Sequence, residues 1–125
     1  MSPVTPPKVN IVINPPDAEH NYQTVSLEGE IDRDTLPSLR EDLEVFLASF
    51  QGTNLVFDFQ DLLFINSEGI GYLSDIHNRF ELLNKHVFII NTSARIMDIF
   101  QLVGLNQIIP CVNSIDELLA KIKIK

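Results

Sequence analysis

The residues best suited to chemistry in this sequence lie together at Asn66–Gly71, in the order Asn-Ser-Glu-Gly-Ile-Gly. The apolar segment Leu55–Phe59 before them is typical of a buried strand, and the helical spacing of apolar residues begins at Ile70. Asn66 or Ser67 is therefore the expected N-cap of a helix, whose side-chain oxygen accepts a hydrogen bond from a free backbone N–H. A helix N-terminus also favours negative charge, including that of a phosphate placed on the Ser67 hydroxyl.

Sequence patterns of common enzymes are incomplete in this chain. Gly69 and Gly71 are followed by Ser74 where a dinucleotide-binding loop needs its third glycine, and no Gly-x-x-x-x-Gly-Lys-Ser/Thr segment is present. A nucleophile elbow requires glycine where Ile65 stands. The histidines lack the spacing of metal ligands: His20, His77 and His86. We therefore predict that the chain is not an enzyme, with no catalytic residue, no metal site and no cofactor.

The helix that follows Ser67 is expected to present two faces. Its apolar stripe would contain Leu73, His77, Phe80 and Leu83. The residues off this stripe would line a docking surface beside Ser67, although an ordinary solvated face explains them too: Tyr72, Ser74, Asp75 and Asn78. Gly69 and Gly71 either let a partner approach the backbone or allow the helix to pack tightly on a sheet. Asp58 either orients the loop before the helix or is a satisfied polar group of the sheet.

The first half of the chain predicts a strand pair followed by a helix. Polar and apolar residues alternate at Val9–Ile13, and a second strand at Thr24–Leu27 would complete an antiparallel pair. Glu28–Asp32 is expected to turn, and Asp34 or Thr35 to cap a helix. That helix would bury Leu36, Leu39, Leu43, Phe46, Leu47 and Phe50, and leave Arg40, Glu41, Asp42 and Glu44 in solvent.

The second half alternates strand and helix patterns. Val87–Ile90 predicts a buried strand, Ser93 caps the next helix, and Gly104 ends it. Ile108–Ile109 is expected to form a short strand, and Ser114 to open the last helix. The inward residues of that helix would be Ile115, Leu118, Leu119 and Ile122. Alternating strands and helices predict parallel strands joined by right-handed crossovers.

Length and charge narrow the class of protein. A chain of 125 residues is sufficient for one domain with a hydrophobic core. We expect residues 1–7, which hold three prolines, to be a flexible lead-in to a domain at 8–125. The net charge of −8 disfavours nucleic acid and anionic membranes, and no apolar run is long enough for a membrane span. A single cysteine and no export signal agree with a cytoplasmic location.

Three separated stretches are similar, in order and spacing, to the motifs of one family. Leu27–Asp32 resembles an opening Leu-x-Gly-Glu-Leu-Asp motif, and Phe57–Gly71 resembles a strand, loop and helix start that usually reads Asp-Ser-Ser/Thr-Gly-Leu-Gly. Leu102–Leu105 and Ser114–Leu119 resemble the C-terminal end. Together they resemble the STAS domains, and within them the bacterial anti-sigma-factor antagonists. The resemblance implies an α/β STAS-like single domain: a mixed sheet with an N-terminal antiparallel pair, then parallel βα units, and helices packed against it.

The resemblance also implies a function in partner switching. In that family, the serine matching Ser67 is phosphorylated by a partner that is both a serine kinase and an anti-sigma factor. The unphosphorylated antagonist binds this partner and frees the sigma factor, phosphorylation abolishes binding, and a PP2C-type phosphatase resets the cycle. The implied docking surface contains Asn66, Ser67, Glu68, Gly69 and Gly71, together with Tyr72, Ser74, Asp75 and Asn78.

Two residues of the motif differ from the family pattern. Asn66 stands where the family usually has Asp, and Glu68 stands where it has Ser or Thr. The swap keeps the local charge but moves the carboxylate by two positions. Two alternatives stay open: a non-phosphorylated STAS scaffold held in one state by Asn66 and Glu68, and a small-molecule or lipid-binding STAS domain that uses the groove at the helix start.

Overall fold

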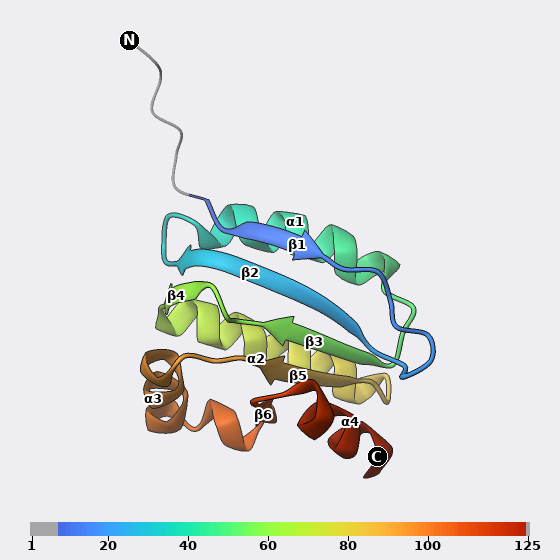
Figure 1. The fold of residues 1–125 in the computed structure, drawn as a ribbon. Helices are drawn as coiled ribbons and strands as arrows, with labels where there is room; N and C mark the ends of the chain where they lie inside the picture. The colour runs from blue at the N-terminus through green and yellow to red at the C-terminus, as the bar shows by residue number, and fades with distance from the viewer. Residues whose placement is uncertain (1–7, 125) are drawn as a thin grey trace.

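The computed structural model describes residues 8–124 of the chain, and the expectation for residues 1–7 lies outside them. Six strands form a single mixed sheet in the order β1-β2-β3-β5-β6, and β4 pairs with β2 beyond the end of β3 (Figure 1). The fold class predicted from the sequence is confirmed: an N-terminal antiparallel pair is followed by parallel strands alternating with helices.

The strands account for the two halves of the sequence pattern. β1 (Asn10–Ile13) lies antiparallel to β2 (Gln23–Ile31). The other strand pairs are all parallel and join β2 to β3 and β4, β3 to β5, and β5 to β6. Their bounds are Asn54–Asp58 for β3, Leu62–Ile65 for β4, His86–Ile90 for β5 and Cys111–Val112 for β6.

The helices cover the two faces of the sheet unequally (Figure 1). α1 (Leu36–Ser49) and α2 (Ser67–Leu82) pack on one face, and α4 (Ile115–Ile124) packs on the other over β5 and β6. α3 (Ala94–Val103) and the short 3₁₀ helix η1 (Leu105–Gln107) lie between β5 and β6 in the chain. The larger hydrophobic core lies under α1 and α2, and a smaller one lies under α4.

The predicted turn at Glu28–Asp32 is wrong, because β2 continues through Ile31. Gly29 suggested a turn, but its φ of 117° belongs to an irregularity at which the pairing with β4 shifts. The Gly29 N–H donates to the Asp61 carbonyl oxygen at 3.0 Å. β4 itself was expected to be loop; its short apolar run resumes pairing with β2 after a tight turn at Phe59.

Smaller differences lie at helix and strand ends. Ile108–Ile109 is not a strand, because both N–H groups donate to the Leu105 carbonyl oxygen and continue the turn of η1. Leu83 follows the end of α2 and is 63% exposed, since the buried stripe of that helix runs through Leu73, Ile76 and Phe80 instead. Ile115, expected to point inward, is 43% exposed at the first turn of α4.

Candidate functional site: the start of helix α2

Asn66 fixes the start of α2. Its backbone is extended (φ −89°, ψ 177°), and its side-chain Oδ1 accepts a hydrogen bond from the Gly69 N–H at 2.9 Å. The Asn66 N–H donates to the Ile31 carbonyl oxygen at 2.9 Å, which ties the helix start to the end of β2. Of the two caps that the sequence allowed, the structure has Asn66.

Ser67 is the first residue of α2 and is exposed to solvent. Because Asn66 caps the helix, the Ser67 hydroxyl is not needed for that purpose, and within residues 8–124 it makes no hydrogen bond. Glu68, also exposed, puts a carboxylate in the first turn. The N-terminal N–H groups of a helix carry partial positive charge, which Glu68 partly balances.

The two glycines of the motif have different surroundings. A Cβ added to Gly69 would lie 2.7 Å from Ile31 Cγ2 and 2.8 Å from Ile65 Cγ1, so close packing on the sheet requires glycine there. A Cβ added to Gly71 would meet none of the described atoms of residues 8–124 within 4 Å. Gly69 is buried and is therefore not part of an accessible surface, whereas Gly71 is exposed.

A row of small, uncharged residues extends from Ser67 along α2. Gly71, Ser74 and Asn78 follow Ser67 at helical spacing; Gly71 and Asn78 are exposed, and Ser74 is half-buried. We call Ser67, Gly71, Ser74 and Asn78 the α2 row. It joins three of the residues expected on the docking surface to the candidate phosphorylation site.

Tyr72 was expected on the same surface, and its exposure was predicted wrongly. It is 6% exposed and lies between α1 and α2, where its hydroxyl donates to Glu44 Oε2 at 2.6 Å. Glu44, expected in solvent, also accepts from Arg79 through both oxygens, at 2.9 and 2.7 Å. The Arg40 guanidinium lies 4.8 Å from the centre of the Tyr72 ring.

This cluster forms a polar groove between α1 and α2, lined by Arg40, Glu44, Glu68, Gly71, Tyr72, Asp75 and Arg79. Hydrogen bonds from Arg79 hold the pKa of the Glu44 carboxyl at about 2, below its ordinary 4.5. Burial and the bond to Glu44 raise the pKa of Tyr72 above its ordinary value. The groove therefore keeps Glu44 ionised and Tyr72 neutral at physiological pH.

The sequence did not identify Arg40, Glu44 and Arg79 as neighbours of the site. Arg40 and Glu44 are one helical turn apart on α1, which is a visible signal, but nothing local indicates that Tyr72 and Arg79 face them from α2. The contact between α1 and α2 depends on how these two helices pack on the sheet.

Asp58 contacts the turn that follows β3 and the residue that follows β5. Its Oδ1 accepts from the Gln60 N–H at 3.0 Å and from the Asn91 side-chain amide at 3.3 Å. The bond from Asn91 links Asp58 to the sheet, and the bond from Gln60 links it to the turn after β3, so both roles considered from the sequence remain open.

Residues 8–124 contain no group of three or more His, Cys, Asp or Glu side chains arranged to hold a metal ion. No helix in that range combines the length and apolar character needed to cross a bilayer.

Comparison with known proteins gives the family. Residues 15–118 match the model of the STAS domain. An anti-sigma-B factor antagonist from Listeria monocytogenes is 26% identical over 105 residues, which cover 84% of this chain and 91% of that protein.

Solved structures agree on the fold. An anti-sigma factor antagonist from Mycobacterium paratuberculosis is 21% identical, with a TM-score of 0.78 over 92% of this chain and 94% of that one. SpoIIAA in its unphosphorylated form is 20% identical, with a TM-score of 0.68 over 93% and 98%. Bacillus SpoIIAA in the phosphorylated form is 18% identical, with a TM-score of 0.63 over 90% and 99%. From the domain match and this shared fold, the chain belongs to the STAS domain family.

Proposed function

We propose that this chain is a phosphorylation-controlled protein-binding regulator of the anti-sigma-factor antagonist type. The proposal rests on one observation at the start of α2. Asn66 caps the helix, and the Ser67 hydroxyl is exposed and makes no hydrogen bond within residues 8–124. The distant similarity to anti-sigma-B factor antagonists supports the choice of partner class.

The partner would be an anti-sigma factor with serine kinase activity. It would cover the α2 row in the unphosphorylated state, because small uncharged side chains are desolvated at low cost in a protein interface. The kinase would transfer the γ-phosphoryl group of ATP to Ser67 Oγ, and the hydroxyl proton would leave to solvent or to a base of the kinase. A PP2C-type phosphatase would hydrolyse the phosphate and reset the switch.

The phosphate would act on binding more than on folding. It adds about −1.5 to −2 charges at pH 7 and would lie at a helix N-terminus, which tolerates an anion. In an interface the same group would have to lose its water beside the fixed carboxylate of Glu68, and that combination disfavours a complex.

The first experiment is phosphosite mapping on the protein purified from its native cells, with and without phosphatase treatment. Three serines lie at helix starts, but Ser93 and Ser114 accept hydrogen bonds from the N–H groups of Ile96 and Glu117. We expect phosphatase-sensitive phosphate on Ser67 and none on the two capping serines. If the mass of the intact protein equals that of the unmodified chain under both growth and stress conditions, the non-phosphorylated scaffold is favoured instead.

The second experiment measures binding to each serine-kinase anti-sigma factor encoded in the same genome. Ser67→Asp is expected to weaken the complex at least tenfold, and Ser67→Ala to bind normally while taking no phosphate. Ser114→Asp is the matched control, since Asp caps a helix as well as Ser does. Normal binding by Ser67→Asp would rule out the switch.

A further inference from the structure

A cleft lies on the face of the sheet opposite α1 and α2. Side chains alternate along a strand, so Thr24, Asp58 and Ile90 point away from the core under α1 and α2. The start of α4 and the connection between β1 and β2 flank this surface, and the cleft between them is open to solvent with a volume of about 820 Å³. That volume is in the range of protein ligand sites. The lining residues of the connection are Asn14, Pro15, Pro16, Asp17, Ala18 and Glu19.

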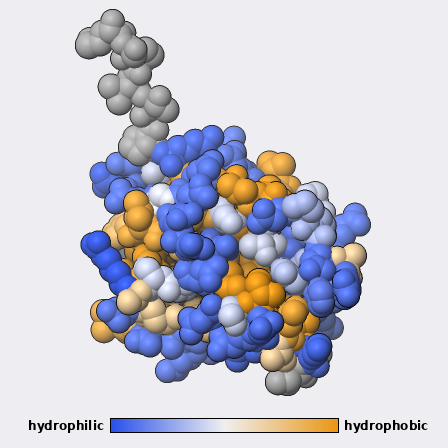
Figure 2. All heavy atoms as spheres, viewed as in Figure 1, coloured by the Kyte–Doolittle hydropathy of each residue, from blue (hydrophilic) through white to orange (hydrophobic). Residues whose placement is uncertain are grey.

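Part of the cleft is apolar and open to solvent. Figure 2 shows hydrophobic atoms exposed in the middle of this face, surrounded by hydrophilic ones. Ile115 contributes to the lining and is 43% exposed, although its position in the α4 sequence predicts burial. Tyr22 also lines the cleft and packs on the smaller core beneath it, of which Ile90, 2% exposed, is a buried member. Covering an apolar surface of this kind with a ligand lowers the free energy of the system, because the surface is removed from water.

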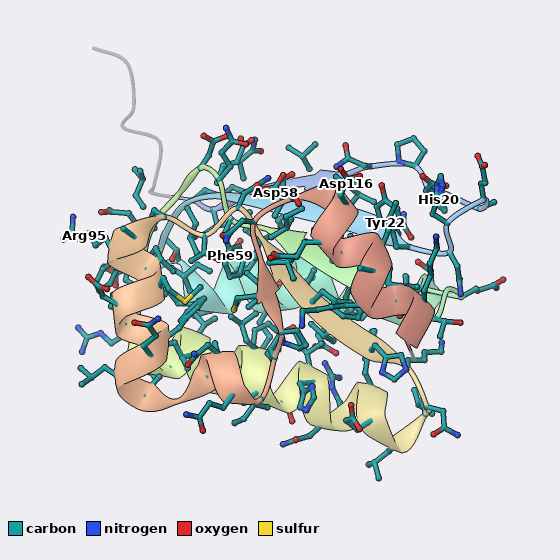
Figure 3. All side chains as sticks on the ribbon, turned by 60° about the horizontal axis from the view of Figure 1, so that its bottom comes forward. His20, Tyr22, Asp58, Phe59, Arg95 and Asp116 are labelled. Atoms are coloured by element: carbon teal, nitrogen blue, oxygen red, sulfur yellow. The ribbon has the colours of Figure 1, made fainter. Side chains whose placement is uncertain are left out.

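The charged groups of the cleft all have one sign. Asp17, Glu19 and Asp58 line it, and none of the lysines and arginines between positions 8 and 124 does. His20 is the neighbour of Asp17, with its Nδ1 3.1 Å from Asp17 Oδ2. Asp58 uses only Oδ1 for its two bonds, and within residues 8–124 nothing donates to its other oxygen. Figure 3 shows Asp58 and Tyr22 beside α4, whose first turn carries Asp116.

We propose that this cleft is a second docking site, which binds a basic segment of a protein partner. A lysine or arginine side chain would lay its methylene groups against Ile115 and Tyr22 and place its charged end on Asp58. Such side chains combine an apolar stem with a cation, which matches both parts of the cleft. The site is separate from Ser67 and does not depend on the phosphorylation switch.

A protein segment fits this surface better than an anionic membrane. The net charge of −8 repels anionic lipids, whereas it steers a basic partner toward the molecule. The polar groups along the cleft, those of Asn14, Thr24 and Asn91, are suited to hydrogen bonds with an extended backbone.

The test is an NMR titration of the isotope-labelled full chain with a short glycine peptide that carries two lysines. A peptide with glutamine at both positions is the matched probe. We expect the lysine peptide to shift resonances of Asn91, Ile115 and their neighbours, and the glutamine peptide to bind at least tenfold more weakly. Asp58→Asn should weaken the lysine peptide roughly tenfold. Asp61→Asn removes an exposed carboxylate outside the cleft and should change binding less than twofold.

Several outcomes would overturn the proposal. Shifts scattered over the acidic surface, with equal losses in Asp58→Asn and Asp61→Asn, would mean non-specific attraction. Stronger and equally localised binding of spermidine would assign the cleft to a small amine. Cleft resonances that move with protein concentration alone would assign it to a second copy of the chain. If Asp58→Asn does not fold, Glu19→Gln replaces it: Glu19 is exposed and is expected to weaken the lysine peptide two- to threefold.

Discussion

Helices α2 and α3 both begin after a parallel strand, yet they use serine differently. At α3, Ser93 is the cap and its Oγ accepts from the Ile96 N–H at 3.2 Å. At α2, Asn66 is the cap and Ser67 comes one position later, with its hydroxyl in solvent. A serine at a helix start is therefore not by itself a candidate for modification. What distinguishes Ser67 is a neighbour that has already satisfied the helix end.

The two helices also differ in how they are held. α2 approaches the sheet closely at Gly69 and is tied to α1 by Glu44 through Tyr72 and Arg79. α3 has an ordinary Ile96 in the position equivalent to Gly69, and within residues 8–124 no ion pair joins it to another element. α2 is thus held by more contacts than α3, which would suit the proposed recognition of Ser67 by a kinase and a partner.

The largest effect is expected from Gly69→Ala. The new Cβ would lie less than 3 Å from side-chain atoms of Ile31 and Ile65, so the helix or the strands must move. We expect a loss of about 2 kcal/mol in the free energy of unfolding, the usual range for overpacking. Urea unfolding followed by circular dichroism measures it.

Gly71→Ala is the control for this substitution. None of the described atoms of residues 8–124 lies within 4 Å of its added Cβ, and alanine is the better helix former by about 0.5–1 kcal/mol. We expect a small gain in stability. Equal effects of the two substitutions would contradict the close packing that separates α2 from α3.

A set of alanine substitutions tests the comparison directly. Asn66→Ala and Ser93→Ala each remove a cap and should lower the free energy of unfolding by about 1 kcal/mol. Ser67→Ala removes a hydroxyl without a described partner and should change it by less than about 0.5 kcal/mol. A loss at Ser67 as large as that at Ser93 would show that its hydroxyl is structural, and the argument for modification would fail.

Most of the fold follows from patterns that are local in the chain. The strand and helix periods, the cap at Ser93 and the C-cap at Gly104 are signals within a few residues, and they predicted α3 to its ends. Gly29 misled the prediction, because glycine occurs both in turns and in strand irregularities, and only the partner strand decides between them.

The sequence predicted those residues of the candidate site whose surroundings come from a single segment of the chain. It did not predict those whose surroundings come from two segments. Asn66 and Ser67 follow from the motif, whereas the burial of Tyr72 requires knowledge that α1 presents Glu44 to it. Asp58 was linked to the motif loop because it is near in sequence. It does bond to the Gln60 N–H, but it also accepts from Asn91, which follows β5 and is brought close only by the strand order.

The link between α1 and α2 predicts that stability depends on pH. The pKa of Glu44 is about 2 in the folded protein and 4.5 ordinarily, so its stabilising effect is complete above pH 4.5 and is lost as pH falls toward 2. Because Glu44 and Arg79 are about 40% exposed, solvent screening limits the effect to about 0.5–1 kcal/mol.

Glu44→Gln should remove this part of the pH dependence, and Glu41→Gln, an exposed neighbour on the same helix, should leave it unchanged. Urea unfolding at a series of pH values between 2 and 6 measures both. Identical acid profiles for Glu44→Gln and the unaltered protein would mean that the bonds to Arg79 and Tyr72 contribute nothing to holding α2.

The smallest change in the free energy of unfolding is expected for Ser67→Asp. A small change is informative, because it means that the variant tests the charge on Ser67 without damaging the fold. An aspartate in the first turn interacts favourably with the helix N-terminus by about 0.3–1 kcal/mol. The Glu68 carboxylate repels it through solvent by about 0.7 kcal/mol, the value for two charges roughly 6 Å apart in water. We expect a net change below about 0.3 kcal/mol in urea unfolding at low salt. In a Glu68→Gln background the same substitution should become stabilising by a few tenths of a kcal/mol, because the repulsion is gone. If Ser67→Asp instead destabilised the fold by 1 kcal/mol or more, weaker partner binding by that variant would reflect a damaged fold and not the charge on Ser67.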